Sequence, residues 1–484
     1  MRRRTVASAF VAVLVSVAPL AGAAAPLSDA LKAKRPKGGE WFGLYLLGKK
    51  VGHAYVDLAL VPGQPDKAKA TNEFVFETKV DTRVSRRVVR DVRIYESKPN
   101  GRLLSFVIEQ HGDGGDQIIE GTNTPSGLHI IRKRPGAPND VRTLPPSSET
   151  IEAADQARVA LWRGGKVESR YTDGTDLEAY RVTSEVMPDA ERVLGGVKTK
   201  VKRVSTLSEK ENVPTINVFT RQGETVEIQM GETLRAVAEP KEVAERLDKV
   251  EVFALTRVVL PEKLDESRRM IPGQLKLTVT GLPERFCKNS ARQKFRQLGK
   301  GRTEITITAR FPDKESRLSR PVKDPTGGQY LEPTLTVESD DAQIAALAKK
   351  IVGGEKDAYA AAKAITFWVY QHMQRDYGAS ADRATDVLRR MKGDCTEHAL
   401  LATALMRAAG IPARRVDGVV YVMNEDGVPA LYWHEWVQAY VGEWTDLDPT
   451  FNQAVADATH LALGEEGSAE ITPLIGSLKV EKVE

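Results

Sequence analysis

Residues 392–410 have the sequence KGDCTEHALLATALMRAAG, a polar turn followed by a strongly apolar segment. The leucines and alanines recur at helical spacing, and Gly410 marks the end of the predicted helix. Cys395 therefore lies in the first turn. Because the first backbone N–H groups of a helix lack intrahelical partners and carry partial positive charge, they stabilise a thiolate. The pattern predicts a nucleophilic cysteine.

A nucleophilic cysteine needs a base, and the base needs a group that orients it. Residues 431–440 (LYWHEWVQAY) predict a strand, and residues 444–450 (WTDLDPT) predict its antiparallel return after a tight turn. This hairpin brings His434 diagonally opposite Asp448, within reach of an imidazole–carboxylate hydrogen bond. The register is open by a residue or two, so Asp446 is the alternative partner of the histidine.

Three separated blocks carry a resemblance to a known family. GDCTEHA with the following AAGIPAR, then HEW, then WTDLDPT together resemble the core of the transglutaminase-like superfamily over roughly residues 340–455. In order and spacing, Cys395, His434 and Asp448 match the catalytic Cys, His and Asp of that family. The resemblance implies a papain-like core, in which the nucleophile helix packs against an antiparallel sheet that bears the His and the Asp.

The resemblance also implies a cysteine acyl-transfer reaction on protein or peptide amides. Cys395 would form a thioester, with its backbone N–H as one oxyanion donor. The second donor stays open among three residues that precede the nucleophile: Trp368, Gln371 and Tyr377. Water as acceptor gives protease or amidase activity and an amine gives cross-linking, and both stay open. No acidic cluster resembles the calcium sites of animal transglutaminases, so we expect neither a metal nor another cofactor.

Three other interpretations compete with this one. Cys395, His398 and His434 are a possible zinc set, although zinc sites usually gather more Cys and His at tighter spacing. The fold is also compatible with a non-catalytic periplasmic binding or scaffold protein that uses its β-rich front for recognition. Finally, Cys287 and Cys395 permit a disulfide in an oxidising compartment, although one bridge adds little to a chain of 484 residues.

The beginning of the chain predicts export. Three arginines at positions 2–4 precede a short apolar run that ends in small residues, which is the pattern of a secretory signal peptide over residues 1–23. The run contains Pro19 and is short for a membrane-spanning helix, so an uncleaved anchor is the lesser alternative. We expect a periplasmic or secreted protein without stable membrane insertion after cleavage. The oligomeric state stays open.

Composition and charge narrow the class of protein and its partners. The chain is 41% hydrophobic and 28% charged, which is typical of soluble globular proteins, and its length indicates about three domains. Most of the formal net charge of +4 belongs to the N-terminal arginines, so electrostatics do not favour a nucleic-acid partner. The expected partner is a protein or peptide substrate.

The patterns along the chain predict an α+β protein. A β-rich antiparallel region covers residues 30–260, a small β module covers 261–330, and the catalytic domain covers 340–484. In the front region we expect a hairpin over Trp41–Leu60 and one helix over Ile151–Trp162. The front also looks like regions that precede transglutaminase-like domains in exported bacterial proteins. Before the nucleophile, helices are predicted over three ranges: Ala342–Ile351, Ala358–Met373 and Ala384–Met391.

Overall fold

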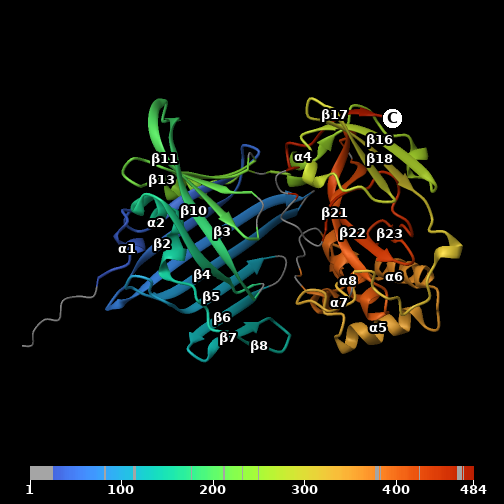
Figure 1. Ribbon diagram of the computed structural model, residues 1–484, viewed down its shortest axis with the longest axis horizontal. Helices are drawn as coiled ribbons and strands as arrows, with labels where there is room; N and C mark the ends of the chain where they lie inside the picture. Colours follow the sequence, from blue (N-terminus) through green and yellow to red (C-terminus); the bar gives the residue numbers. More distant parts are fainter. Residues whose placement is uncertain are drawn as a thin grey trace, which may run out of the picture.

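The computed structural model describes most of the chain in two lobes. The described residues are 26–80, 83–112, 116–175, 177–210, 213–231, 233–248, 250–326, 328–376, 381, 383–424, 426–465, 471 and 474–484. The predicted signal peptide, 1–23, lies outside them. Figure 1 shows a strand-rich front lobe, coloured blue to green, beside a second lobe coloured yellow to red. Within the described segments, no helix is both long and apolar enough to cross a membrane.

The front lobe is built on one antiparallel sheet of 14 strands in the order β8-β7-β6-β5-β4-β3-β2-β1-β14-β13-β12-β11-β10-β9. The strands are β1 (Glu40–Leu46), β2 (Lys49–Val61), β3 (Gln64–Val80), β4 (Arg83–Glu96), β5 (Leu103–Gly112), β6 (Gln117–Thr124), β7 (Gly127–Lys133), β8 (Asp140–Leu144), β9 (Lys166–Asp173), β10 (Glu178–Leu194), β11 (Val197–Ser208), β12 (Thr215–Phe219), β13 (Thr225–Met230) and β14 (Leu234–Ala238). Every pair of consecutive strands from β1 to β8 and from β9 to β14 is hydrogen-bonded. The first strand then joins the last, β1 to β14.

The local predictions for this lobe are confirmed. The hairpin turn between β1 and β2 is formed by Leu47 and Gly48, both with positive φ, which matches the twist of the two strands. The predicted helix begins as a 3-10 turn, η1 (Ile151–Asp155), and continues as α2 (Gln156–Arg163). Gly164 ends it in the left-handed conformation. The structure adds strands β7 to β10 and β14, which the sequence patterns did not predict.

The second lobe has four helices on an antiparallel sheet. The helices are α5 (Ala342–Val352), α6 (Ala358–His372), α7 (Ala384–Arg390) and α8 (Cys395–Ala408). The sheet has the order β15-β22-β21-β24 with β23 paired to β22, and its strands are β15 (Val258–Val259), β21 (Ala413–Met423), β22 (Pro429–Tyr440), β23 (Trp444–Leu447) and β24 (Leu461–Glu465). Two short parallel strands, β19 (Gln374–Arg375) and β20 (Lys392–Gly393), lead into the nucleophile turn. All four predicted helices are confirmed within about two residues.

A small sheet of four strands sits on the second lobe, at the top right in Figure 1. Its strands are β16 (Gly273–Thr280), β17 (Gln293–Gly299), β18 (Arg302–Ala309) and β25 (Lys479–Val483). The first three belong to the predicted small β module, whereas β25 comes from the end of the chain and pairs with β16. The remaining short helical segments are α1 (Asp29–Lys32), α3 (Lys241–Ala244), α4 (Val252–Thr256), η2 (Glu266–Arg269), η3 (Glu284–Phe286) and η4 (Lys314–Ser316).

Helix α8 is the centre of the second lobe because almost every residue of it is buried. Its side chains pack on α5, α6 and α7, and on the sheet strands β21 and β22. The same two strands also supply Val419 and Leu431 to the core of the small sheet. One sheet therefore connects the two hydrophobic cores of this lobe. Close packing against it fixes the position of α8.

The two lobes touch through ion pairs close to the nucleophile turn. Arg134, after β7, pairs with Asp386 on α7, and Asp140 at the start of β8 pairs with Arg383 at 3.0 Å. The front lobe therefore contacts the segment that leads into Cys395.

Candidate active site

The turn that carries Cys395 is held by a capping box. Asp394 is the N-cap of α8 and accepts a hydrogen bond from the backbone N–H of Thr396 at 2.8 Å. Glu397 in return accepts from the backbone N–H of Asp394 at 2.9 Å. Its other oxygen accepts from the backbone N–H of Ala381 at 2.9 Å. The sequence D-C-T-E thus fixes the helix start, and Cys395 lies in the first turn, as predicted, at the first residue of α8.

The environment of the thiol differs from the one we expected. Burial, together with the nearby carboxylates of Asp394, Glu435 and Asp448, raises the pKa of the Cys395 thiol well above its usual value. A hydrogen bond with the backbone of Glu435 acts in the opposite direction. The helix end favours the thiolate, whereas burial and the nearby carboxylates act in the opposite direction. The raised pKa favours the protonated thiol, so a nucleophilic role for Cys395 requires a base.

The hairpin brings His434 to Asp448, as expected from the sequence. β22 and β23 pair with the register Val437 to Leu447, so the extended register sets His434 opposite the segment that follows β23. Nε2 of His434 lies 2.8 Å from Oδ2 of Asp448. The imidazole ring stacks on Phe451 with a centroid distance of 4.9 Å, and the thiol lies against the backbone of the next residue, Glu435. Nδ1 of His434 has no hydrogen-bond partner in the described part of the chain.

Asp448 is a fully buried carboxylate whose oxygens only accept hydrogen bonds. Its Oδ1 accepts from the backbone N–H groups of Thr450 at 2.6 Å and Phe451 at 3.1 Å. Its Oδ2 accepts from His434 and, at 3.0 Å, from Nε2 of His460. These partners lower the pKa of Asp448 far below its usual value in spite of its burial, with His434 as the largest of the lowering causes. The carboxylate is ionised, so Nε2 of His434 carries the proton that they share.

Asp446, the alternative partner, has a different role. It accepts from the indole N–H of Trp436 at 2.9 Å and from the side-chain amide of Gln438 at 2.7 Å. It also faces Nε of Arg292 at 3.4 Å. Asp446 therefore braces the face of β22 next to His434, while Asp448 contacts the imidazole itself.

With this geometry established, we compared the chain with known proteins. Residues 345–449, which contain the nucleophile helix and the hairpin, match the model of the transglutaminase-like superfamily. This part of the chain is a transglutaminase-like domain. A curated but uncharacterized protein of Mycobacterium leprae is 25% identical over 154 residues, which are 31% of this chain and 54% of that protein. The chain thus spans about half the length of this relative.

Solved structures resemble parts of the chain at low similarity. A putative cysteine protease from Cytophaga hutchinsonii has 18% identity and a TM-score of 0.31, and the match covers 44% of this chain and 83% of that one. The periplasmic domain of TgpA from Pseudomonas aeruginosa has 17% identity and a TM-score of 0.27, covering 40% and 87%. A β-barrel-like protein from Brucella abortus has 10% identity and a TM-score of 0.31, covering 42% and 94%.

The competing roles for the cysteines and for His398 do not fit the structure. Cys287 and Cys395 are both free, so the disulfide alternative is wrong. His398 is buried in α8, and its Nδ1 lies 2.6 Å from the carbonyl oxygen of Asp394. This bond supports the start of α8, and Cys395, His398 and His434 do not form a group of potential metal ligands among the described residues.

A buried group with metal-ligating atoms does occur, in a different place. The ligand atoms of His434, Asp448 and His460 all lie within 4.8 Å of one another. Both histidines, however, make direct hydrogen bonds to one carboxylate oxygen at 2.8 and 3.0 Å. Their Nε2 atoms carry protons there and have no lone pair for a cation. We therefore assign these residues to a hydrogen-bond network and not to a metal site.

The candidates for the second oxyanion donor lie in different environments. Trp368 stacks on His372 at 4.3 Å within α6, and Gln371 is exposed at the end of that helix. Tyr377 lies outside the described residues. Between them, Arg375 donates to the carbonyl of Thr450 at 2.7 Å and so joins the segment before the nucleophile to the loop that carries Asp448.

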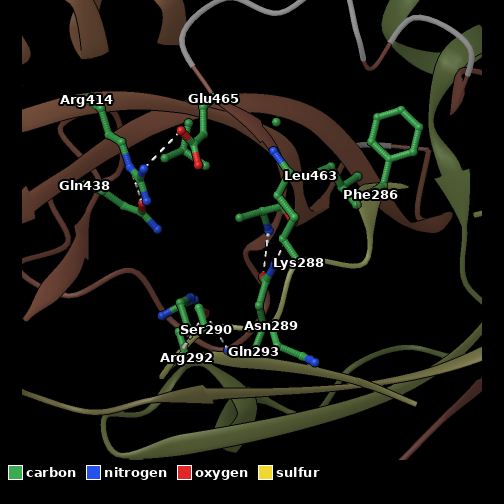
Figure 2. A pocket seen from close by; sticks show the side chains of 13 residues that line it. Phe286, Lys288, Asn289, Ser290, Arg292, Gln293, Arg414, Gln438, Leu463 and Glu465 are labelled. Carbon is green, nitrogen blue, oxygen red and sulfur yellow. Dashed lines mark hydrogen bonds and ion pairs between the residues drawn. The ribbon is translucent and has the colours of Figure 1, made fainter. Parts of the chain in front are cut away.

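A cavity of about 260 Å³ lies beside the bracing residues of this domain. Figure 2 shows Arg414 close to Gln438 and Glu465, with Arg292 across the pocket. Arg414 donates to Gln438 at 2.9 Å and pairs with Glu465 at 3.0 Å. Neither Cys395 nor His434 lines this cavity, so it is separate from the catalytic candidates.

Sequence reasoning missed one pair that contacts the candidate site. Asp457 and His460 lie three residues apart in the loop before β24, and His460 reaches Asp448. An Asp and a His at this spacing are common on loops, so the pattern alone carries little information. Only the fold shows that both side chains point inward and are buried.

Proposed function

We propose that this chain is an exported cysteine acyl-transfer enzyme whose transglutaminase-like domain acts on protein or peptide amides. Cys395 is the nucleophile, His434 the base and Asp448 the residue that orients the base. The proposal includes a papain-like arrangement of the nucleophile helix on the antiparallel sheet. It also includes removal of the predicted signal peptide and a periplasmic or secreted location.

One observation carries the proposal. The hydrogen bond between Nε2 of His434 and ionised Asp448 leaves Nδ1 as the ring atom with a lone pair. The base precedes Glu435, whose backbone contacts the Cys395 thiol, and that thiol stands at a helix N-terminus and has a raised pKa. A base that is fixed in one tautomer next to a protonated nucleophile is the arrangement that general-base activation requires.

The reaction follows from these roles. Nδ1 of His434 takes the thiol proton while Sγ of Cys395 bonds to the amide carbonyl carbon, and the carbonyl oxygen takes up the negative charge. The imidazolium returns the proton to the departing amine as the carbon–nitrogen bond breaks, which leaves a thioester. Water then gives an acid, and a primary amine gives a new amide. Asp448 holds the ring and stabilises its cation throughout.

A second candidate function, recognition without catalysis, is favoured by one observation. The Cys395 thiol is surrounded by three carboxylates, and its pKa is raised. A binding protein could keep such a cysteine without using it.

One experiment separates these functions. The purified protein is incubated with a peptide library and a tagged primary amine, and products are identified by mass spectrometry. Cleaved peptides indicate a protease, deamidated glutamine an amidase, and amine adducts a cross-linker. The Cys395→Ala variant should form none of them, whereas Cys287→Ala should form all that the parent forms. A parent that forms none of these products would favour the recognition function, whereas equal product formation by the parent and Cys395→Ala would place the chemistry on another residue.

A further inference from the structure

The loop before β24 places a second histidine behind the carboxylate of the proposed triad. His460 is completely buried, with its ring against the edge of Trp436 at a centroid distance of 5.2 Å. Its Nε2 lies 3.0 Å from Oδ2 of Asp448, and its Nδ1 lies 3.2 Å from Oδ1 of Asp457. Both ring nitrogens therefore face carboxylate oxygens.

Neither carboxylate has a proton to donate to this ring. Asp448 accepts two backbone N–H groups on one oxygen and His434 on the other. Asp457 accepts the backbone N–H of Thr459 at 2.9 Å, the Thr459 hydroxyl at 2.5 Å and the side-chain amide of Gln453 at 2.8 Å. A neutral imidazole has only one N–H, so one of its lone pairs would point at a carboxylate oxygen. Two N–H groups are needed to satisfy both contacts.

We propose that His460 is a positioning residue, held as an imidazolium, whose two N–H groups clamp Asp448 and Asp457 and thereby fix the carboxylate that orients His434. This inference deepens the proposed function and rests on it. The cation also offsets part of the negative charge around the Cys395 thiol, where Asp394, Glu435 and Asp448 all disfavour the thiolate.

The other charged groups around His460 agree with this assignment. His434 on β22 faces it at a ring distance of 5.8 Å, and Asp448 and Asp457 come from the loop after β23. Arg292, before β17, donates to the carbonyl oxygens of residues 456, 457 and 460 and so fastens the loop rather than the ring. The hydrogen bonds to the two carboxylates raise the pKa of His460 in spite of its burial, in agreement with the contacts.

The charge state can be measured without any substrate. Full-length protein labelled with ¹⁵N-histidine is examined by long-range ¹H–¹⁵N correlation NMR at pH 7, with and without EDTA. We expect one buried histidine with both ring nitrogens protonated, whose signals disappear in His460→Gln and are unchanged by EDTA. A singly protonated His460, or N–H signals that vanish when zinc is added, would overturn the proposal.

The positioning role is measured by the rate at which iodoacetamide alkylates Cys395 as a function of pH, in a Cys287→Ala background. His460→Gln should slow alkylation at neutral pH about 10- to 100-fold, as is usual for groups that orient a functional side chain from behind. The midpoint of the pH profile should move upward, because a cation near the thiol is lost. Asp457→Asn, which touches His460 but not His434, should shift the midpoint in the same direction by less.

The matched control is His53→Gln, because His53 is also buried but lies in the front lobe and contacts none of these groups. It should alkylate like the parent. A His460→Gln protein with the parent's rate and midpoint would contradict the positioning role. Both readouts are independent of amide turnover, so a protein without acyl-transfer activity would refute the proposed function while the NMR result still decides the state of His460.

Discussion

The front lobe and the transglutaminase-like domain each bury a network of charged side chains. The two networks differ in whether every nitrogen of the central side chain has a hydrogen-bond partner. In the front lobe, Arg93 is the centre: its guanidinium donates to Asp91, to Glu149 at 2.9 Å and to the hydroxyl of Tyr171 at 2.7 Å. Arginine stays charged and each of its guanidinium nitrogens has an acceptor, so Arg93 has no proton to exchange.

The network of the transglutaminase-like domain contains a histidine with one nitrogen that remains without a partner among the described residues. His434 is fixed by Asp448 through Nε2, and the residue that follows it, Glu435, contacts the Cys395 thiol through its backbone. Burial of charge is therefore no sign of catalysis by itself. The comparison teaches that a functional network is recognised by a group that can still exchange a proton and by a nucleophile within its reach.

The largest effect is expected when the proposed nucleophile is removed. Cys395→Ala should lower amide turnover by at least about 10³-fold, because no other group in the proposed mechanism forms the thioester. Product formation is followed by mass spectrometry, with Cys287→Ala as the control. Cys287 is half-buried and its thiol contacts Pro283 and Gln297, far from the proposed triad in sequence and sheet, so its removal should leave turnover intact. A large loss in the control would place the chemistry elsewhere.

The next largest effect is expected when each of the two hairpin aspartates is replaced, one at a time, by asparagine. Asp448→Asn should reduce turnover by about 10²- to 10⁴-fold, because an amide that donates to Nε2 forces His434 into the wrong tautomer. Asp446→Asn should cost less than about 10-fold, since Asp446 braces Trp436 and Gln438 and does not touch the imidazole. Rates are compared at equal folded concentration by circular dichroism. Equal losses of turnover in both variants would indicate that Asp446 also orients His434.

The third prediction concerns the buried charge network of the front lobe. Arg93→Met should lower the free energy of unfolding by about 3–5 kcal/mol, because it leaves Asp91 and Glu149 buried without their cation. Arg90→Met on the same strand should change it by less than about 1 kcal/mol, since Arg90 is half-exposed. Denaturant unfolding measures both. Under native conditions Cys395 of either variant should alkylate at the parent's rate, and a slower rate in Arg93→Met would show that the two networks are coupled.

The smallest expected effect is the dependence of stability on pH. The lowered pKa values of Asp448 and Asp457 stabilise the fold above about pH 4, the value of an unfolded Asp, and this contribution is lost as the pH falls. The raised pKa of His460 acts oppositely: its contribution is complete below about pH 6.5 and is lost as the pH rises through the folded value.

Thermal unfolding across about pH 3–9 should therefore show the greatest stability between these limits. In Asp457→Asn the decline on the alkaline side should shrink, because His460 has lost one of its two carboxylates. An alkaline limb identical to the parent's would mean that His460 is not the group that titrates there.

Much of the candidate site is predictable because its parts are local. The apolar spacing after Cys395 sets the length of α8, the D-C-T-E pattern sets its start, and the alternation in residues 431–440 sets which face of β22 carries His434. Each of these depends on backbone geometry within a few residues. The hairpin register follows from a short turn, so the pairing of His434 with Asp448 is also a short-range consequence.

The sequence by itself therefore determined the helix with Cys395 in its first turn, the hairpin with His434 and Asp448, and the transglutaminase-like character of residues 345–449. Only the tertiary structure decided that burial and nearby carboxylates raise the pKa of the thiol, that His460 stands behind Asp448, and that the final strand β25 pairs with β16, far earlier in the chain. The physical reason is the same in each case. The pKa of a group and the partners of a buried polar atom depend on desolvation and on charges brought in by distant segments, and no local pattern records which segments those are.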